Sequence, residues 1–222
     1  MCFYHDRFIP EEYNFYNNYE VCGIDEAGRG PLAGPLSISL VSFSQEALTT
    51  ILKGSILSSL NDSKLLSPKK REFVYFEIKK YAKVALLQFV SNKFIDNYGL
   101  TYSIYYGLKK LVVKSGLKNP YLLIDGNYNF SRFDKNLSYK SIVKGDSKIA
   151  SIAAASIIAK VNRDWFMQKM SSKFPEYEFE KHKGYGTKVH IKNIEKFGYC
   201  RIHRKTFVIK KGTKNWEQES IK

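Results

Sequence analysis

Two adjacent carboxylates, Asp25 and Glu26, follow an apolar segment and precede a glycine-rich turn in the sequence GIDEAGRGPLAGP. Residues 21–24 are mostly apolar and predict a strand, which Gly28 and Gly30 would end while letting the backbone approach a ligand. Hard divalent cations bind carboxylates held at such an edge. The alternative is a surface turn with two solvated acids, because charged residues are mostly exposed.

Two more carboxylates stand near the ends of predicted strands. Asp125 follows the apolar run 121–124, and Asp146 follows a short predicted strand at residues 141–143. Ligands of α/β proteins commonly bind where the carboxyl ends of neighbouring strands meet. Taken singly, Asp125 fits a turn with the glycine after it, and Asp146 fits a helix N-cap. Taken together, convergent carboxylates indicate phosphate chemistry in which two divalent ions, about 3.5–4 Å apart, activate water and stabilise the leaving oxygen.

Glu26 raises a geometric difficulty for this interpretation. Successive residues of a regular strand face opposite sides of the sheet, so Glu26 joins Asp25 only where the chain twists or the strand ends. The sequence Ala-Gly-Arg-Gly-Pro at residues 27–31 is compatible with such an ending.

The composition is that of one large globular domain with a basic surface. A chain of 222 residues can bury a substantial core. No apolar run approaches the roughly 18 residues of a membrane span, and the start MCFYHDRFIP lacks the apolar core of a signal peptide, so we expect a cytoplasmic protein without membrane contact. The net charge of +15 favours a polyanionic partner such as nucleic acid, although part of the lysine content can reflect genomic base composition. The three cysteines have no metal-ligand spacing, and we expect reduced thiols.

Alternating strand and helix patterns predict an α/β fold. The continuous apolar run 84–90 is typical of a buried strand. The sequence KIASIAAASIIAK predicts a buried central helix, because small residues let a helix lie close to a sheet. Ser67 and Pro68 supply an N-cap and a first helical residue. The predicted strands are 21–25, 36–43, 84–90, 121–124 and 141–143, and the predicted helices are 68–81, 101–114, 147–170 and 188–197.

Six segments between Gly23 and Phe207 carry a resemblance to a known family. They read GIDEAGRGPLAGP, NDSKLLSPKKRE, LLIDGN, KGDSKIASIAAASIIAKVNRD, HKGYGTKVH and HRKTF. In this order they resemble the type 2 ribonuclease H enzymes of bacteria, which cut RNA in RNA-DNA duplexes and at single ribonucleotides embedded in DNA. The resemblance implies an α/β fold of the ribonuclease H-like type, with a mixed five-stranded sheet flanked by helices and a small helical C-terminal section. We expect an N-terminal extension at residues 1–18, the catalytic domain at 19–207 and a polar tail at 208–222.

By this resemblance, four carboxylates are catalytic and bind two Mg²⁺ or Mn²⁺ ions. They are Asp25, Glu26, Asp125 and Asp146. The implied reaction is hydrolysis on the 5′ side of a ribonucleotide, leaving a 3′-hydroxyl and a 5′-phosphate. The implied partners are RNA-DNA hybrids and duplex DNA containing ribonucleotides, and we expect a monomer.

The resemblance also implies residues that read the substrate. The turn Gly28-Arg29-Gly30 would read the ribose 2′-hydroxyl, largely through backbone groups that glycines leave accessible. Tyr185, in HKGYGT, would pack on the next deoxyribose. Lys64 and Lys183 are candidate phosphate contacts, or equally solvated charges in a lysine-rich chain.

Several residues outside this set also carry predictions. Asp164 is expected to be structural, paired with Arg163 or a backbone group, because an unbroken helix would place it roughly 27 Å from Asp146. His203 is expected to be hydrogen-bonded structure rather than a general base. Leu65 stands where the family commonly has a second lysine, which weakens a phosphate role for that loop. The segment 127–139 is unusually long and aromatic for the family, and we expect it to alter the approach to Asp125.

Two other functions are compatible with parts of the pattern. Another metal nuclease of the same fold class, such as an integrase-like enzyme, would use the carboxylates but has no need of GRG and HKGYGT. A catalytically inactive RNA-binding protein would use the positive charge, but it has no use for four convergent carboxylates.

Overall fold

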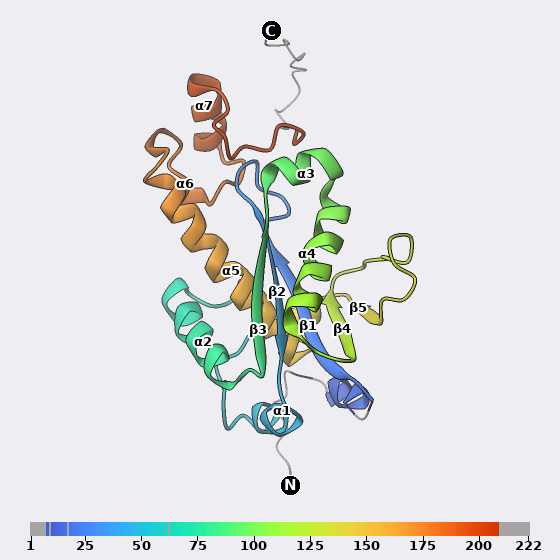
Figure 1. Ribbon diagram of the computed structural model, residues 1–222. Helices are drawn as coiled ribbons and strands as arrows, with labels where there is room; N and C mark the ends of the chain where they lie inside the picture. The colour runs from blue at the N-terminus through green and yellow to red at the C-terminus, as the bar shows by residue number, and fades with distance from the viewer. Residues whose placement is uncertain (1–7, 9, 17, 62, 209–222) are drawn as a thin grey trace.

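A mixed five-stranded sheet forms the centre of the protein (Figure 1). The computed structural model describes residues 8, 10–16, 18–61 and 63–208. The strand order is β3-β2-β1-β4-β5, with β1 antiparallel to β2 and parallel to β4. The strands are β1 (Glu20–Ala27), β2 (Leu36–Ser42), β3 (Val84–Val90), β4 (Pro120–Asp125) and β5 (Tyr139–Ile142). Because β1, β4 and β5 run in the same direction, their carboxyl ends lie at one edge of the sheet.

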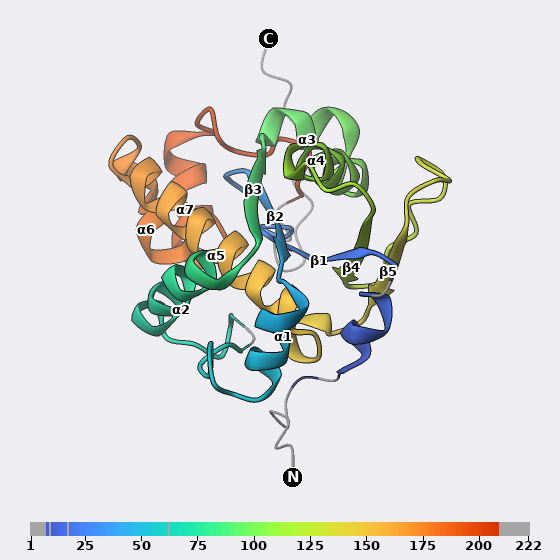
Figure 2. The ribbon, with the colours of Figure 1, turned by 60° about the horizontal axis from the view of Figure 1, so that its bottom comes forward.

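Helices cover both faces of this sheet, as predicted (Figures 1 and 2). On one face α5 lies across β1 and β2 with α2 beside it, and on the other α4 packs on β2 and β3. The small C-terminal section contains α6 and α7, beyond the end of α5. The helices are α1 (Gln45–Leu52), α2 (Pro68–Tyr81), α3 (Asn92–Tyr98), α4 (Leu100–Ser115), α5 (Ala150–Ser171), α6 (Phe179–His182) and α7 (Lys188–Phe197), with short 3₁₀ turns η1 (Pro10–Phe15), η2 (Gly145–Ser147) and η3 (Pro175–Tyr177).

The Ala- and Ser-rich helix α5 is buried as predicted. Every residue from 150 to 159 is buried. At Gly23 of β1 an added Cβ would lie 2.1 Å from the backbone carbonyl carbon of Ser151, so the helix backbone rests directly on the strand. This close approach holds the end of β1 and the start of α5 together, where the predicted carboxylates lie.

Several predicted boundaries and burials need correction. Residues 84–90 form a strand, but it lies at the edge of the sheet and is mostly half-buried, because an apolar run does not reveal its position in the strand order. Helix α5 begins at Ala150, after the η2 turn that contains Asp146. The N-cap residue of α5 is Ile149, so the N-cap interpretation of Asp146 is wrong. The helices α1 and α3 were not predicted.

The described part of the N-terminal segment packs against the domain. Phe8 is buried in the cluster beside α5, and Glu12 is 1% exposed. The Ser151 N–H, in the first turn of α5, donates to Glu12 Oε2 at 3.4 Å. Burial raises the pKa of Glu12 to about 7. Residues 1–7, 9 and 17 of the predicted extension and 209–222 of the predicted tail lie outside the described residues.

None of the helices in the described part of the chain combines the length and the apolar character that a membrane span needs.

Candidate active site

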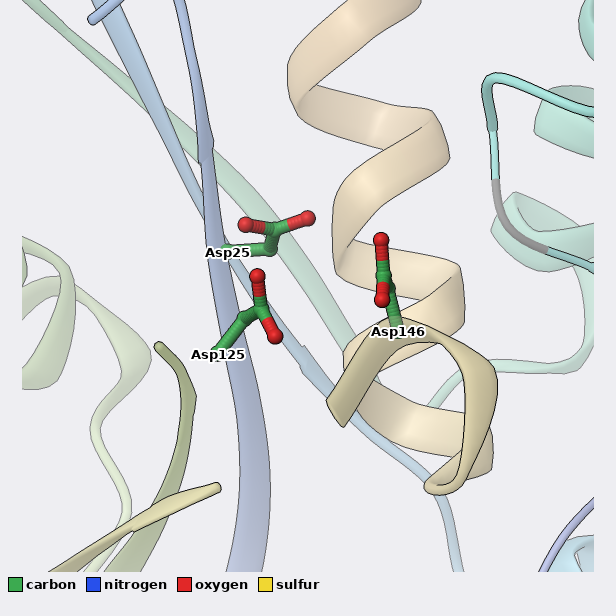
Figure 3. A group of neighbouring side chains, drawn as sticks. All are labelled: Asp25, Asp125 and Asp146. Atoms are coloured by element: carbon green, nitrogen blue, oxygen red, sulfur yellow. The ribbon is translucent and has the colours of Figure 1, made fainter. Parts of the chain in front are cut away.

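Three aspartates from separate elements converge at the carboxyl edge of the sheet (Figure 3). Asp25 lies on β1, Asp125 ends β4 and Asp146 lies in η2. Because Ile24 pairs with Ile124 in the parallel ladder, the aspartates that follow them emerge side by side. One carboxylate oxygen from each aspartate lies within 4.8 Å of the others. The predicted convergence of these three acids is therefore present.

The electrostatics of this group suit a hard divalent cation. Burial, followed by repulsion from Glu26 and Asp125, raises the pKa of Asp25 well above its usual value. Burial and then repulsion from Asp146 likewise raise the pKa of Asp125. Oxygens that lie within 4.8 Å of one another match ligand distances of about 2.0–2.6 Å around one ion. Because buried like charges repel in the protein alone, the donor set fits a cation that neutralises them.

Backbone N–H groups hold two of these carboxylates in place. The Glu26 N–H donates to Asp25 Oδ1 at 2.7 Å, and the Gly145 N–H donates to Asp125 Oδ1 at 2.7 Å. The second bond connects the end of β4 to the turn that carries Asp146. The aspartates are therefore fixed by backbone rather than by long side chains.

Glu26 lies near this group but outside it. Strand β1 continues to Ala27, and Glu26 still pairs with Ile38 of β2, so the strand does not end at Asp25. Neighbouring Ile24 packs on the α4 side of the sheet, whereas Gly23 meets α5. Residue alternation therefore places Asp25 toward α5 and Glu26 toward the opposite face. The alternation expected from the sequence is therefore present, yet both side chains line the same pocket at this edge of the sheet.

The Glu26 carboxyl has its own partners. Its Oε1 accepts a hydrogen bond from the Tyr128 hydroxyl at 2.7 Å, and Arg29 Nη1 lies 3.6 Å from the same oxygen. Its Oε2 is buried and has no hydrogen-bond partner among the described groups. Burial raises the pKa of Glu26 to about 7, against the opposing effects of Tyr128 and Arg29. One oxygen thus remains available to a further cation.

A pocket of about 330 Å³ brings most of the predicted residues together. The predicted residues that line it are Asp25, Glu26, Gly28, Arg29, Gly30, Lys64, Asp125 and Tyr185. The other lining residues, for which no role was predicted, are Ala27, Ser63, Ser156 and Lys160. Ser156 and Lys160 are four residues apart on α5, so they share a helix face, and that spacing was the available signal.

The two predicted lysines differ in position. Lys64 Nζ lies 3.3 Å from Asp146 Oδ2, next to the carboxylate group. Lys183 is not among the residues that line this pocket, and its Nζ donates to the Glu180 carbonyl at 2.7 Å. Only Lys64 is therefore brought to the carboxylates.

Asp164 is held away from the carboxylate group, as predicted, but its partners differ. It forms ion pairs with Lys160 at 2.6 Å and with Arg71 at 3.5 Å, rather than with Arg163. The side chain of Arg163 points instead to backbone carbonyls of the glycine-rich turn. An arginine adjacent in sequence on a helix faces a different direction, which explains the error.

Two buried arginines support the glycine-rich turn from below. Arg204 is 0% exposed and donates to the carbonyl oxygens of Gly28, Arg29 and Gly34 at 2.6, 3.0 and 3.0 Å. Arg163 is 1% exposed and donates to the carbonyls of Ala33, Pro35 and Lys183. Both lie in segments that carry the family resemblance, NRD and HRKTF, yet Arg204 was assigned no role from the sequence, and Arg163 was expected only to pair with Asp164.

Gly28 is the position where this turn requires glycine. Its φ is +95°, and an added Cβ would lie 2.1 Å from Arg163 Nε. Gly30 is different, because an added Cβ would meet only the Tyr185 ring, at 4.0 Å. The turn is therefore crowded at Gly28, against Arg163, and open at Gly30, on the side that faces Tyr185.

Tyr185 lies beside the glycine-rich turn. Its side chain is 46% exposed, and its ring lies over the Arg163 guanidinium at 5.9 Å. The loop that carries it joins the turn through backbone bonds, since the Leu32 N–H donates to the Gly184 carbonyl at 2.8 Å. The two predicted substrate-reading elements therefore form one connected surface.

The aromatic segment 127–139 reaches the site through Tyr128. This tyrosine donates to Glu26, and the Arg29 guanidinium lies 5.6 Å from the centre of its ring. Its ring stacks on Phe130 at 5.1 Å, and Phe130 is fully buried. The segment thus contacts the site at Glu26 and Arg29.

Comparison with known proteins agrees with this geometry. The family model described as Ribonuclease HII matches residues 22–210. Ribonuclease HII of Endomicrobium trichonymphae is 45% identical over 87% of this chain and 89% of its own length, and that of Caldicellulosiruptor saccharolyticus is 42% identical over 91% of each. The crystal structure of ribonuclease H2 from Pyrococcus horikoshii OT3 has a TM-score of 0.66 and 26% identity, over 84% of this chain and 92% of that one. Since the fold, the acidic site and these relatives agree, the chain belongs to the ribonuclease HII family, which consists of metal-dependent ribonuclease H endonucleases.

Proposed function

We propose that this enzyme hydrolyses the RNA strand of RNA-DNA hybrids and cuts on the 5′ side of single ribonucleotides embedded in duplex DNA. The products are a 3′-hydroxyl and a 5′-phosphate. The observation that supports this proposal is one pocket of about 330 Å³ that joins Asp25, Glu26 and Asp125 to the turn and tyrosine that would read a ribose-deoxyribose junction. A general nuclease has no need of the second half of that pocket.

We propose that two Mg²⁺ or Mn²⁺ ions bind to Asp25, Glu26, Asp125 and Asp146. The three aspartates fit one cation by distance, and the unpartnered buried oxygen of Glu26 supplies a fourth carboxylate. When bound, two such ions ready a water for attack and stabilise the leaving oxygen. The Glu26 and Gly145 N–H groups fix the orientation of Asp25 and Asp125. Without bound cations, the carboxylates would repel the phosphodiester.

Lysines at the pocket offset this repulsion. Lys64 lies 3.3 Å from Asp146, and its side chain is 75% exposed, so its ammonium is accessible to a phosphate. Lys160 lines the same pocket and pairs with Asp164. The net charge of +15 adds a long-range attraction to nucleic acid.

The glycine-rich turn and Tyr185 supply specificity. The open side of Gly30 lets a sugar approach the backbone, where its 2′-hydroxyl is read. Tyr185, half-exposed beside it, packs on the following deoxyribose. The two elements together require ribose on one side and deoxyribose on the other.

One cleavage assay tests the proposal. The substrates are a DNA duplex with one embedded ribonucleotide and the same duplex made of DNA alone, each with Mg²⁺, with Mn²⁺ and with excess chelator. We expect metal-dependent cleavage 5′ of the ribonucleotide and none of the all-DNA duplex. Cleavage of the all-DNA duplex would favour an integrase-like nuclease, and binding without cleavage would favour an inactive RNA-binding protein.

A further inference from the structure

Three buried histidines lie directly beneath the Tyr185 loop. His182, His190 and His203 are 8%, 0% and 1% exposed. The rings of His182 and His190 stack at 4.4 Å, and His190 Nε2 lies 3.0 Å from His203 Nε2. None of them lines the carboxylate pocket, and among the described residues they do not form a group with metal-ligand geometry. Their contacts therefore need an explanation other than catalysis or metal binding.

Fixed backbone groups determine which nitrogen of each ring carries the proton. The Cys200 N–H donates to His203 Nδ1 at 2.9 Å, nearer than the Cys200 carbonyl at 3.3 Å, so Nδ1 is the acceptor and Nε2 carries the proton. That Nε2–H donates to His190 Nε2, which leaves the proton of His190 on Nδ1. The His190 Nδ1–H then donates to the Tyr185 carbonyl at 2.9 Å.

The result is a directional chain of hydrogen bonds that ends on Tyr185. It runs from the Cys200 N–H through His203 and His190 to the Tyr185 carbonyl. Burial lowers the pKa of both His190 and His203 to about 4, so both rings are neutral at neutral pH, as the chain requires. His182 holds the same loop at the adjacent position, since the Gly184 N–H donates to its Nδ1 at 3.2 Å.

We infer that His190 and His203 are positioning residues that set the placement of Tyr185 against the glycine-rich turn, and so determine junction specificity. The inference rests on the proposed function, because it assigns to Tyr185 the role of packing on the deoxyribose. The chain of hydrogen bonds connects the Tyr185 backbone to the backbone of Cys200. The Gly184 carbonyl connects the same loop to Leu32. The tyrosine ring is thereby held at the open side of Gly30.

The first test needs no substitution and no substrate. Long-range ¹H-¹⁵N NMR spectra of the wild-type histidine rings report which nitrogen carries the proton. We expect the Nδ1–H form for His190 and the Nε2–H form for His203 at pH 7. An Nε2–H form of His190 would break the chain and overturn the inference, whatever the enzyme's activity.

The second test compares two substitutions of one histidine. Both His190→Asn and His190→Leu lose the contact with His203, but only the asparagine amide retains a donor near the position of Nδ1. In single-turnover cleavage of one embedded ribonucleotide, we expect His190→Leu to be about tenfold slower than wild type, and His190→Asn to recover most of that loss. Equal losses in the two variants would indicate general structural damage and contradict the inference.

A double-mutant cycle with Tyr185→Ala separates positioning from stability. If His190 acts through Tyr185, adding His190→Leu to Tyr185→Ala slows cleavage by no more than about twofold, and Mn²⁺ affinity measured by calorimetry is unchanged. A further tenfold loss in the double variant would overturn the inference while leaving the proposed function intact. A Tyr185→Ala variant that cleaves like wild type would instead contradict the proposed role of Tyr185.

Discussion

The carboxylate pocket differs from the layer of Arg163 and Arg204 beneath the substrate-reading loops in how its buried charges are compensated. In the pocket, burial and then repulsion from Glu26 and Asp125 raise the pKa of Asp25, and one buried oxygen of Glu26 has no described hydrogen-bond partner. In the layer below, Arg163 and Arg204 are equally buried, yet each donates hydrogen bonds to three backbone carbonyls. The pocket leaves a buried oxygen unpartnered, whereas the layer gives its buried guanidinium groups hydrogen-bond acceptors, even though burial and repulsion from Arg163 lower the pKa of Arg204 to about 9. The region with the unpartnered oxygen is the one suited to cation chemistry, and the region with satisfied donors is the one that can hold geometry.

The largest effect is expected when a carboxylate is removed from the pocket. In Asp25→Asn we expect cleavage to fall at least about 1,000-fold, or about 4 kcal/mol in activation free energy, because a metal ligand is lost. The free energy of unfolding should stay equal or rise, since a buried repulsive charge is gone. Single-turnover cleavage and urea unfolding check the two parts. Full activity of the variant, or wild-type cleavage in excess chelator, would contradict the metal-ligand role.

A matched pair of aspartates provides the control. Asp146→Asn should lose nearly all turnover, whereas Asp164→Asn should mainly lower the free energy of unfolding, by about 1 kcal/mol, because it loses its pairs with Lys160 and Arg71. A crystal structure with Mn²⁺ bound to Asp164 would reverse this assignment.

The supporting layer is tested by Arg204→Lys. A lysine cannot donate to all three carbonyls that the guanidinium reaches, so we expect the free energy of unfolding to fall by about 3 kcal/mol. The exposed Arg201→Lys serves as a control and should stay within about 0.5 kcal/mol of wild type. Urea unfolding measures both. If Arg204→Lys were as stable as the control, the layer would not be holding the turn.

The two regions should also respond to pH with opposite signs. Glu26 has a pKa of about 7 in the fold against 4.5 as its ordinary value, so its contribution to stability is present below pH 4.5 and is lost as pH rises through 7. His190 and His203, with pKa values of about 4 against 6.5, stabilise the fold above pH 6.5 and lose that contribution as pH falls through 4.

Glu26→Gln isolates the pocket's part of this response. In metal-free buffer, its free energy of unfolding relative to wild type should increase between pH 4.5 and 7, by up to about 3 kcal/mol. The exposed Glu46→Gln is the control and should show no such trend. Urea titrations at several pH values measure the difference. A flat difference for Glu26→Gln would mean that the pocket does not penalise this carboxylate.

Tyr185 is expected to have a smaller effect, on recognition. Tyr185→Ala should slow single-turnover cleavage of one embedded ribonucleotide about tenfold, because aromatic contacts with nucleic acids contribute about 1–3 kcal/mol and roughly 1.4 kcal/mol corresponds to a factor of ten. Tyr185→Phe should retain most activity if packing outweighs the hydroxyl, and metal binding should be unchanged in both. An alanine variant as fast as wild type would leave the glycine-rich turn as the only reader.

The smallest effects distinguish two lysines that the sequence treats alike. Lys64→Ala should reduce cleavage by a few fold, because its ammonium lies 3.3 Å from Asp146 at the pocket, and the difference from wild type should shrink at high salt, where the attraction of this exposed charge to phosphate is screened. Lys183→Ala should stay within about twofold of wild type, because its ammonium bonds to the Glu180 carbonyl instead. Cleavage rates at two salt concentrations measure both. A larger loss for Lys183→Ala would restore its predicted phosphate contact.

Much of the fold and of the carboxylate site was predictable from local pattern. The apolar approach to Asp25, the run that ends at Asp125 and the small residues of α5 each follow from short-range physics of strands and helices. Strand order was not predictable in the same way, so residues 84–90 were expected to be buried although they form an edge. An apolar run indicates that a strand packs against other apolar elements, but it does not indicate which strands lie beside it in the sheet.

The amino-acid sequence by itself contains the acidic pair, the three aspartates that follow predicted strands, and the motifs that identify the family. Only the tertiary structure decides that Glu26 lines the same pocket as Asp25 while its carboxylate meets Tyr128 and Arg29, because those partners come from other segments of the fold. The same holds for Arg204, which supports Gly28 from 176 residues away, and for His190, which bonds to His203. Local rules place arginine and histidine mostly at or near the surface. Their burial becomes favourable only where distant segments meet and supply backbone acceptors, and that meeting is a property of the whole fold.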